Sequence, residues 1–219
     1  MPGNKFKWNS YNDDNLVAAF DMSTRTAGGL MKNLAKTGAV YDAVINGVFV
    51  PANPLIRAKK TKCMDFDGVN NYITLANPIQ NLTIFSFVCW ANMDALGGMF
   101  FSKVIGVNTY FYVDAVGRIR LEIVGTGTTV KNKQTPIVNR SYMFVCTKDS
   151  SNIAQFFVDG QFVWSGAVGA SEAEVNLFIG RYGGGGGFIY DGRLDNMLFY
   201  NTALDASQIN SIYRSSLPR

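Results

Sequence analysis

The stretch AQFFVDGQFVW, residues 154–164, decides the fold. Two runs of aromatic and β-branched residues flank the dipeptide Asp159-Gly160. An Asp-Gly pair in this setting is the strongest short-range signal for a β-hairpin, because both turn residues must accept a positive φ. Apolar side chains fall on both faces of the predicted hairpin. This pattern predicts that the hairpin lies between two layers of the protein and not at a solvated edge.

The rest of the chain repeats this alternation of short apolar runs and turn residues. Residues 16–22 read as a first strand, and residues 41–45 and 48–50 read as strands of a second hairpin around Asn46-Gly47. Residues 79–91 read as a long central strand. About a dozen short strands in all predict an all-β sandwich.

One helix is predicted near the C-terminus. Asp205 is a suitable N-cap, and Gln208, three residues later, completes a capping box. Ile209, Ile212 and Tyr213 share one apolar face, which predicts that the helix docks on the sandwich.

The amino-acid composition narrows the classes of function that the chain can have. A chain of 219 residues fits a single β-sandwich domain, and the complete lack of histidine removes the commonest general base and metal ligand. Of the three cysteines, Cys89 and Cys146 lie in apolar runs and are expected to be buried small hydrophobic residues. Because the chain has neither a signal-peptide pattern nor an apolar run of membrane-spanning length, we expect cytoplasmic synthesis and no membrane partner.

Positive charge is concentrated near the N-terminus. Residues 1–62 carry nine Lys or Arg against four Asp or Glu, and residues 63–219 carry eleven against twelve. The segment RAKKTK, residues 57–62, is either a solvated loop or a contact for an acidic partner, and no motif for specific nucleic-acid binding accompanies it. Its candidate interaction residues are Arg57, Lys59, Lys60 and Lys62.

Residues 1–15 are polar with interspersed aromatics and are predicted to form an arm that precedes a domain at residues 16–219. Such an arm either packs locally or is disordered, or it lies on a neighbouring subunit. In the second case Phe6, Lys7 and Trp8 are its candidate contacts.

Six blocks in order resemble the laminin-G-like, concanavalin A-like lectin-glucanase jelly-roll domains. The resemblance runs from about Leu16 to Tyr213 and implies a two-sheet antiparallel jelly roll with one short helix. Each block by itself is explained by turns and core packing, so the resemblance implies a fold more strongly than an activity. The blocks are NLAKTG at 33–38, FDGVNNYI at 66–73, LTIFSFVCW at 82–90, FVDG at 157–160, LFIG at 177–180 and GRLDNMLFYNTAL at 192–204.

Some members of that family cleave polysaccharides with carboxylates that alternate on one strand. The nearest pattern here is Glu172 and Glu174, and no third acid follows, so we predict a non-catalytic protein. Other members bind calcium or sugars through loops at one edge, and calcium takes several oxygen ligands. The candidate metal ligands are Asp65, Asp67, Asn70 and Asp195, with Asn71 and Asp191 nearby, although these residues also suit turns.

Aromatic side chains offer a second way to bind a sugar. Tyr110, Tyr112, Tyr182 and Tyr190 are candidates to stack on sugar rings, although packing between strands explains them equally well. The five glycines at 183–187 are either a surface loop or a place where a ligand approaches the backbone closely. They are not a phosphate loop, because neither Lys-Ser/Thr nor a helix follows.

A lone jelly roll with an arm and no catalytic set predicts a structural or interaction protein. Our hypothesis from the sequence is a component of a virion surface, such as a capsid decoration, cement or fibre protein. Its partners would be capsid or tail subunits and further copies of the chain as a homo-oligomer. The alternative is a carbohydrate-binding adhesion module, in a calcium-dependent or calcium-independent form.

Overall fold

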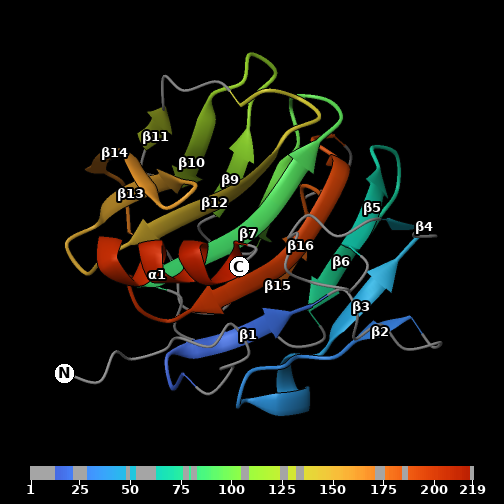
Figure 1. Cartoon of the computed structure of the whole chain (residues 1–219), viewed down its shortest axis with the longest axis horizontal. Coiled ribbons are helices and arrows are strands. Elements are labelled where there is room, and N and C mark those ends of the chain that lie inside the picture. Colours follow the sequence, from blue (N-terminus) through green and yellow to red (C-terminus); the bar gives the residue numbers. More distant parts are fainter. Residues whose placement is uncertain are drawn as a thin grey trace.

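The computed structural model shows two antiparallel β-sheets packed face to face, with a single described α-helix lying on the outer face of one sheet (Figure 1). The structure describes residues 13–21, 29–47, 50–52, 63–75, 79, 83–104, 109–123, 128–131, 136–170, 176–183 and 187–217. Each sheet has eight strands within these residues, which confirms the predicted all-β jelly-roll sandwich.

Sheet A carries the helix. Its order is β14-β13-β12-β7-β16-β5-β4, and β1 also pairs with β16. Its strands are β1 (Leu16–Phe20), β4 (Val50–Ala52), β5 (Cys63–Asp67), β7 (Phe85–Met93), β12 (Ser141–Lys148), β13 (Ile153–Val158), β14 (Gln161–Ala167) and β16 (Asp191–Tyr200).

Sheet B has the order β11-β10-β9-β8-β15-β6-β3-β2. Its strands are β2 (Leu30–Met31), β3 (Ala43–Asn46), β6 (Tyr72–Leu75), β8 (Met99–Val104), β9 (Thr109–Val113), β10 (Ile119–Ile123), β11 (Thr128–Lys131) and β15 (Asn176–Ile179). A short 3-10 helix, η2 (Gly38–Tyr41), precedes β3.

Aromatic side chains fill the space between the sheets. Phe87 of β7 lies with its ring centroid 4.9 Å from that of Phe101 in sheet B and 4.7 Å from that of Phe199 in β16. The long predicted strand at 79–91 therefore contributes Phe87 to a core shared by both sheets, as a sandwich requires. Cys89 and Cys146 are free thiols buried in this core, which confirms the prediction for them.

A second apolar cluster lies between sheet A and helix α1 (Ala206–Ser216). Asp205 accepts a hydrogen bond from the Gln208 backbone N–H, and the Gln208 side chain accepts one from the Asp205 N–H, so the predicted capping box is present. Ile209 and Ile212 are buried, and Tyr213 stacks on Trp90 with ring centroids 5.9 Å apart. The predicted docking face is confirmed.

The hairpin at 154–164 is confirmed, but its predicted position between two layers holds for only one of its strands. Asp159 and Gly160 have φ values of 51° and 75°, as the turn requires. β13 is covered on both faces, since Phe156 faces the main core and Phe157 faces the helix-covered cluster. β14 instead forms an edge of sheet A, and 56% of Phe162 is exposed. The position of a strand in a sheet depends on distant partners, which the local pattern does not encode.

The prediction of a hairpin around Asn46-Gly47 is wrong. β3 pairs with β2 and β6 in sheet B, and β4 pairs with β5 in sheet A, so the chain changes sheets here. Gly47 has φ of +93°, and a Cβ at this position would lie 2.2 Å from Asn71 Oδ1. The glycine is explained by this close approach to the turn after β5 and not by a two-residue hairpin turn.

No helix among the described residues is long and apolar enough to cross a membrane. Residues 1–12 and 53–62 lie outside the described residues, and with them the predicted contacts Phe6, Lys7, Trp8, Arg57, Lys59, Lys60 and Lys62. The predictions for the arm and for the basic segment therefore stay predictions.

Candidate functional site

The outer face of sheet B carries two rows of side chains that run across the strands. The first row follows the strand register from β10 to β3 and consists of Glu122, Tyr110, Ser102, Phe178, Thr74 and Val44. The second row consists of Arg120, Tyr112 and Met99, from β10, β9 and β8. Because alternate residues of a strand share a face, these rows place polar and aromatic groups together on the side of sheet B away from the core.

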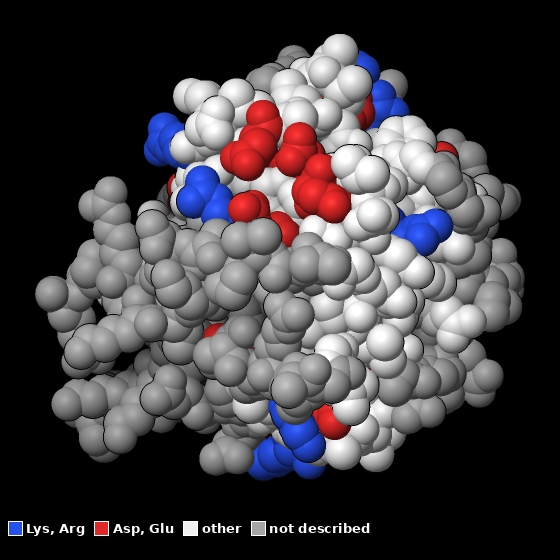
Figure 2. Space-filling view, turned by 90° about the vertical axis from the view of Figure 1, so that its right-hand side faces the viewer, with Lys and Arg blue, Asp and Glu red and all other residues white. Residues whose placement is uncertain are grey.

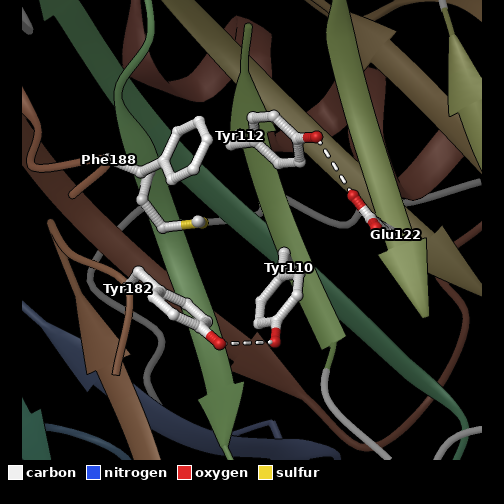
Figure 3. Close-up of a pocket in the computed structure, with 6 residues that line it drawn as sticks. Tyr110, Tyr112, Glu122, Tyr182 and Phe188 are labelled. Carbon is white, nitrogen blue, oxygen red and sulfur yellow. Dashed lines mark hydrogen bonds between the residues drawn. The ribbon is translucent and has the colours of Figure 1, made fainter. Parts of the chain in front are cut away.

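A pocket of about 360 Å³ lies on this face. Its size falls within the range of small-molecule sites in proteins, roughly 300–1,000 Å³. Figure 3 shows that aromatic rings from β9 and from the segment before β16 face each other across it. The described residues that line it are Met99, Tyr110, Tyr112, Glu122, Tyr182 and Phe188.

Two edge-to-face ring contacts shape the pocket. The rings of Tyr110 and Tyr182 lie 5.2 Å apart at 80°, and the Tyr110 hydroxyl donates to the Tyr182 hydroxyl at 3.4 Å. The rings of Tyr112 and Phe188 lie 5.8 Å apart at 60°. Contacts of this geometry hold aromatic rings in defined orientations. Tyr110 and Tyr112 are buried, whereas Tyr182 is half-buried and Phe188 is exposed.

Glu122 supplies the carboxylate of the pocket. The Tyr112 hydroxyl donates to Glu122 Oε2 at 3.1 Å. Burial, and then the negative charge of Glu122, raise the pKa of Tyr112 above its ordinary value of 10.0. The phenol therefore stays protonated at neutral pH, and Glu122 keeps oxygen lone pairs that can accept hydrogen bonds from a ligand.

The segment that supplies Tyr182 and Phe188 is anchored to sheet B. Ser102 Oγ donates to the Arg181 carbonyl oxygen at 2.9 Å and accepts from the Gly183 N–H at 3.0 Å. Phe188 has φ of 51°, which is uncommon for a residue with a bulky side chain. Strained backbone of this kind clusters at ligand sites, and 56% of Phe188 is exposed at the rim of the pocket.

The structure brings together three of the four tyrosines predicted to stack on sugars. Tyr110, Tyr112 and Tyr182 all line the pocket, whereas Tyr190 is fully buried in the core and is wrong as a candidate. Sequence reasoning missed Glu122 and Phe188. The alternation Ile119-Arg120-Leu121-Glu122-Ile123, with its polar residues on one face, was the available signal for Glu122.

The predicted calcium ligands Asp65, Asp67 and Asn70 lie close to the turn after β5. Asp67 Oδ1 accepts hydrogen bonds from the backbone N–H groups of Val69 and Asn70 at 2.9 and 3.0 Å, and from that of Asn71 at 3.1 Å. This is the turn-stabilising role that the sequence also allowed. Because these donors saturate one oxygen of Asp67, they reduce what it can offer a cation.

The structure adds Asp94 to the predicted carboxylates Asp65, Asp67 and Asp191. Figure 2 shows acidic side chains gathered on the side of the molecule that carries β5. Burial, and then the charge of Asp94, raise the pKa of Asp65, and the same two causes raise that of Asp191. The carboxylates therefore repel one another.

Asp195 does not join this group. It is fully buried in β16, where its Oδ1 accepts from the Asn196 N–H at 2.9 Å. It lies four residues, or about 13 Å, along the strand from Asp191, the register partner of Asp67. Among the described residues no three Asp, Glu or Cys side chains form a group able to hold a metal ion. Calcium binding thus stays a prediction, and the function proposed below does not use it.

The predicted carboxylate pair Glu172 and Glu174 lies outside the described residues. The glycine run is described at Gly183 and Gly187 only, and these residues border the two segments that carry Tyr182 and Phe188.

Comparison with known families then identifies the fold. The sequence model of the concanavalin A-like lectin/glucanases superfamily matches residues 67–210, which is more than half of the chain. The chain belongs to this superfamily. The resemblance inferred from the sequence blocks is confirmed. A search of curated proteins finds no match.

Solved structures of the superfamily fold superpose on most of the chain at low identity. The binding domain of Paraclostridial Mosquitocidal Protein 1 has a TM-score of 0.70 at 13% identity, with 92% of this chain and 52% of that chain covered. Domain 4 of AbnA, an extracellular arabinanase from Geobacillus stearothermophilus in complex with arabinotriose, has a TM-score of 0.69 at 15% identity, with 91% and 98% covered. Trypanosoma rangeli sialidase in complex with sialic acid has a TM-score of 0.66 at 15% identity, with 92% and 33% covered.

This chain thus spans about half of the mosquitocidal binding domain and a third of the sialidase, but nearly all of the arabinanase domain. At these identities the similarities establish the fold alone.

Proposed function

We propose that the chain is a carbohydrate-binding module that holds a sugar ring in the aromatic pocket of sheet B. The observation that carries this proposal is the combination of facing aromatic rings with one carboxylate in a pocket of about 360 Å³. A sugar ring has apolar C–H faces and hydroxyl edges. The rings of Tyr182 and Phe188 suit the faces, and Glu122 suits the hydroxyls as an acceptor.

Two structural neighbours support this proposal. The arabinanase domain is a separate domain bound to arabinotriose, and this chain covers 98% of it. The mosquitocidal protein contributes a binding domain. A domain of this fold in complex with an oligosaccharide, and a binding domain that shares the fold over about half of its length, favour binding for this chain as well.

We infer that the module binds without cleaving. Hydrolysis of a glycosidic bond ordinarily uses two carboxyl groups about 5–9.5 Å apart on either side of the bond. Among the described residues that line the pocket, Glu122 is the single carboxylate. Its hydrogen bond with Tyr112 suits an acceptor that orients a ligand.

The proposal can be tested by titrating neutral oligosaccharides, arabinan fragments first, into the full chain by calorimetry. Phe188→Ala removes a pocket ring, and Phe162→Ala is its matched control. Both phenylalanines are 56% exposed, and each contacts one other aromatic ring. The ring centroid of Phe188 lies 5.8 Å from that of Tyr112, and the ring centroid of Phe162 lies 5.7 Å from that of Phe157.

We expect Phe188→Ala to weaken binding about five- to thirtyfold, or about 1–2 kcal/mol, and Phe162→Ala to leave it unchanged. Equal affinity of Phe188→Ala and the wild type for every bound glycan would refute the pocket as the site.

The hypothesis of a virion surface component rests on the arm at 1–15 and the segment at 57–62, of which the structure describes residues 13–15. It stays a prediction, and a particle-surface protein can also bind glycans. Light scattering of the full chain and of a chain that begins at Leu16 separates the two roles. Loss of a defined oligomer on truncation would support assembly through the arm, whereas two monomers would count against it.

A further inference from the structure

A cation–aromatic platform lies beside the pocket on the same face of sheet B. The Cζ of Arg181 lies 4.3 Å from the centroid of the Tyr72 ring, and Arg181 Nε donates to the Tyr182 carbonyl oxygen at 3.2 Å. The Tyr72 ring is also 6.5 Å from that of Phe178. The aromatic ring and the carbonyl together hold the guanidinium in one orientation.

The platform and the pocket share one anchored segment. Ser102 Oγ binds the backbone on both sides of Tyr182, through the Arg181 carbonyl and the Gly183 N–H. From this segment Tyr182 packs against Tyr110 of β9, whereas Arg181 packs against Tyr72 of β6. The pocket and the cation are therefore held in a fixed relation to each other by one segment.

The charge of Arg181 is not neutralised by the described part of the chain. Arg118 and Arg120 both bind Asp114, with Nε to Oδ2 distances of 2.9 and 2.7 Å. Arg181 forms no ion pair with any described residue, and Nε makes the one hydrogen bond of its side chain there. Its two terminal nitrogens thus have N–H groups to offer, in the planar fork that binds a carboxylate bidentately.

The spacing of the strands separates this cation from Glu122. Tyr72 in β6 lies three strands from Tyr110 in β9 and four from Glu122 in β10. At about 4.8 Å per strand these separations are about 14 and 19 Å. The second exceeds the Debye length of about 8 Å at physiological salt, so Glu122 does not cancel the attraction of Arg181 for an anion. The first is longer than one sugar ring, so a ligand that reaches both places is an oligosaccharide.

We propose that Arg181 on Tyr72 is a subsite for the carboxylate of an acidic oligosaccharide, another ring of which occupies the aromatic pocket. This inference rests on the proposed function and names its ligand class, which is a glycan that contains uronic acid. The pocket supplies contacts to the faces of a sugar ring, and Arg181 supplies the preference for the acid.

The test uses matched ligands that differ only in charge. Oligouronates of galacturonic, glucuronic and mannuronic acid, and their methyl esters, are titrated into the full chain at low and at physiological salt. We expect the wild type to bind at least one free acid about tenfold or more tightly than its ester, as a charge-assisted hydrogen-bonded pair would give. Arg181→Gln should bring this ratio to about one and leave ester binding unchanged.

Arg140→Gln is the matched control, because Arg140 also stacks on a tyrosine, with its Cζ 5.0 Å from the Tyr142 ring centroid, away from the pocket lining. It should retain the preference for the acid. Arg181→Lys should restore part of the preference, with a stronger dependence on salt. Melting temperatures of all variants check that each one folds.

The possible outcomes separate the two proposals. If esters bind and Phe188→Ala weakens them, but the wild type shows no preference for the acid or Arg181→Gln retains it, the Arg181 subsite is overturned and the pocket survives. If no acid and no ester binds the wild type, or if Phe188→Ala leaves ester binding unchanged, the inference falls together with the proposed function.

Discussion

Gly160 lies in the turn of the hairpin at 154–164 and packs against Tyr213 of helix α1, which covers sheet A. Replacing Gly160 with alanine should destabilise both the hairpin and the packing of the helix. Its φ is +75°, and a Cβ there would lie 3.0 Å from Tyr213 Cβ. The left-handed conformation costs an L-residue roughly 1–2 kcal/mol. Displacement of Tyr213 from its stack on Trp90 adds about 0.5–1.5 kcal/mol. For a chain of this length each kcal/mol lowers Tm by about 2–4 °C, so we expect Gly160→Ala to lower Tm by about 3–14 °C.

The control is Gly38→Ala, because Gly38 has φ of +60° and no atom within 4 Å of its added Cβ. It carries the backbone strain without the contact and should lower Tm by about half as much. Thermal unfolding is followed by circular dichroism, and the two substitutions are repeated in a Tyr213→Ala background. There the ring contacts at 3.1 and 3.2 Å and the stack on Trp90 are gone and only the contact with Cβ remains, so the extra cost of Gly160→Ala should be smaller. Equal losses for both glycines, or an extra cost that is undiminished in the Tyr213→Ala background, would refute the reasoning.

Two further predictions concern single carboxylates. Asp205→Ala removes the cap of α1 and should lower the free energy of unfolding by about 1 kcal/mol, as measured by urea denaturation, whereas Asp205→Asn should retain most of it. Burial, and then the charges of Asp94 and Asp67, raise the pKa of Asp191 above its ordinary value of 3.8. The folded state therefore binds the proton of Asp191 more tightly than the unfolded state does. The free energy of unfolding accordingly falls as the pH rises through the pKa of the folded state. Asp191→Asn should therefore stabilise the protein by roughly 0.2–0.5 kcal/mol at pH 7 and by almost nothing near pH 3.5, and an equal gain at both pH values would contradict the electrostatic cause.

The sequence alone determined the features that depend on neighbours in the chain. The Asp159-Gly160 turn and the cap of α1 each need only a few consecutive residues, and both are present in the structure. The order of the family blocks fixed the jelly-roll sandwich in the same way. Three of the pocket residues, Tyr110, Tyr112 and Tyr182, could be proposed because aromatic side chains are able to stack on sugar rings.

Only the tertiary structure decided which strands became neighbours. β14 lies at an edge, and Asn46-Gly47 joins two sheets, because pairing is settled by partners far away in the sequence. The pocket could not be predicted from the sequence for the same reason. Glu122 and Phe188 are 66 positions apart in the chain, and Tyr190, a tyrosine of the same kind as Tyr182, faces the core. The pocket and the Arg181 platform exist because sheet B brings β10, β9, β8, β15 and β6 side by side, which no local pattern specifies.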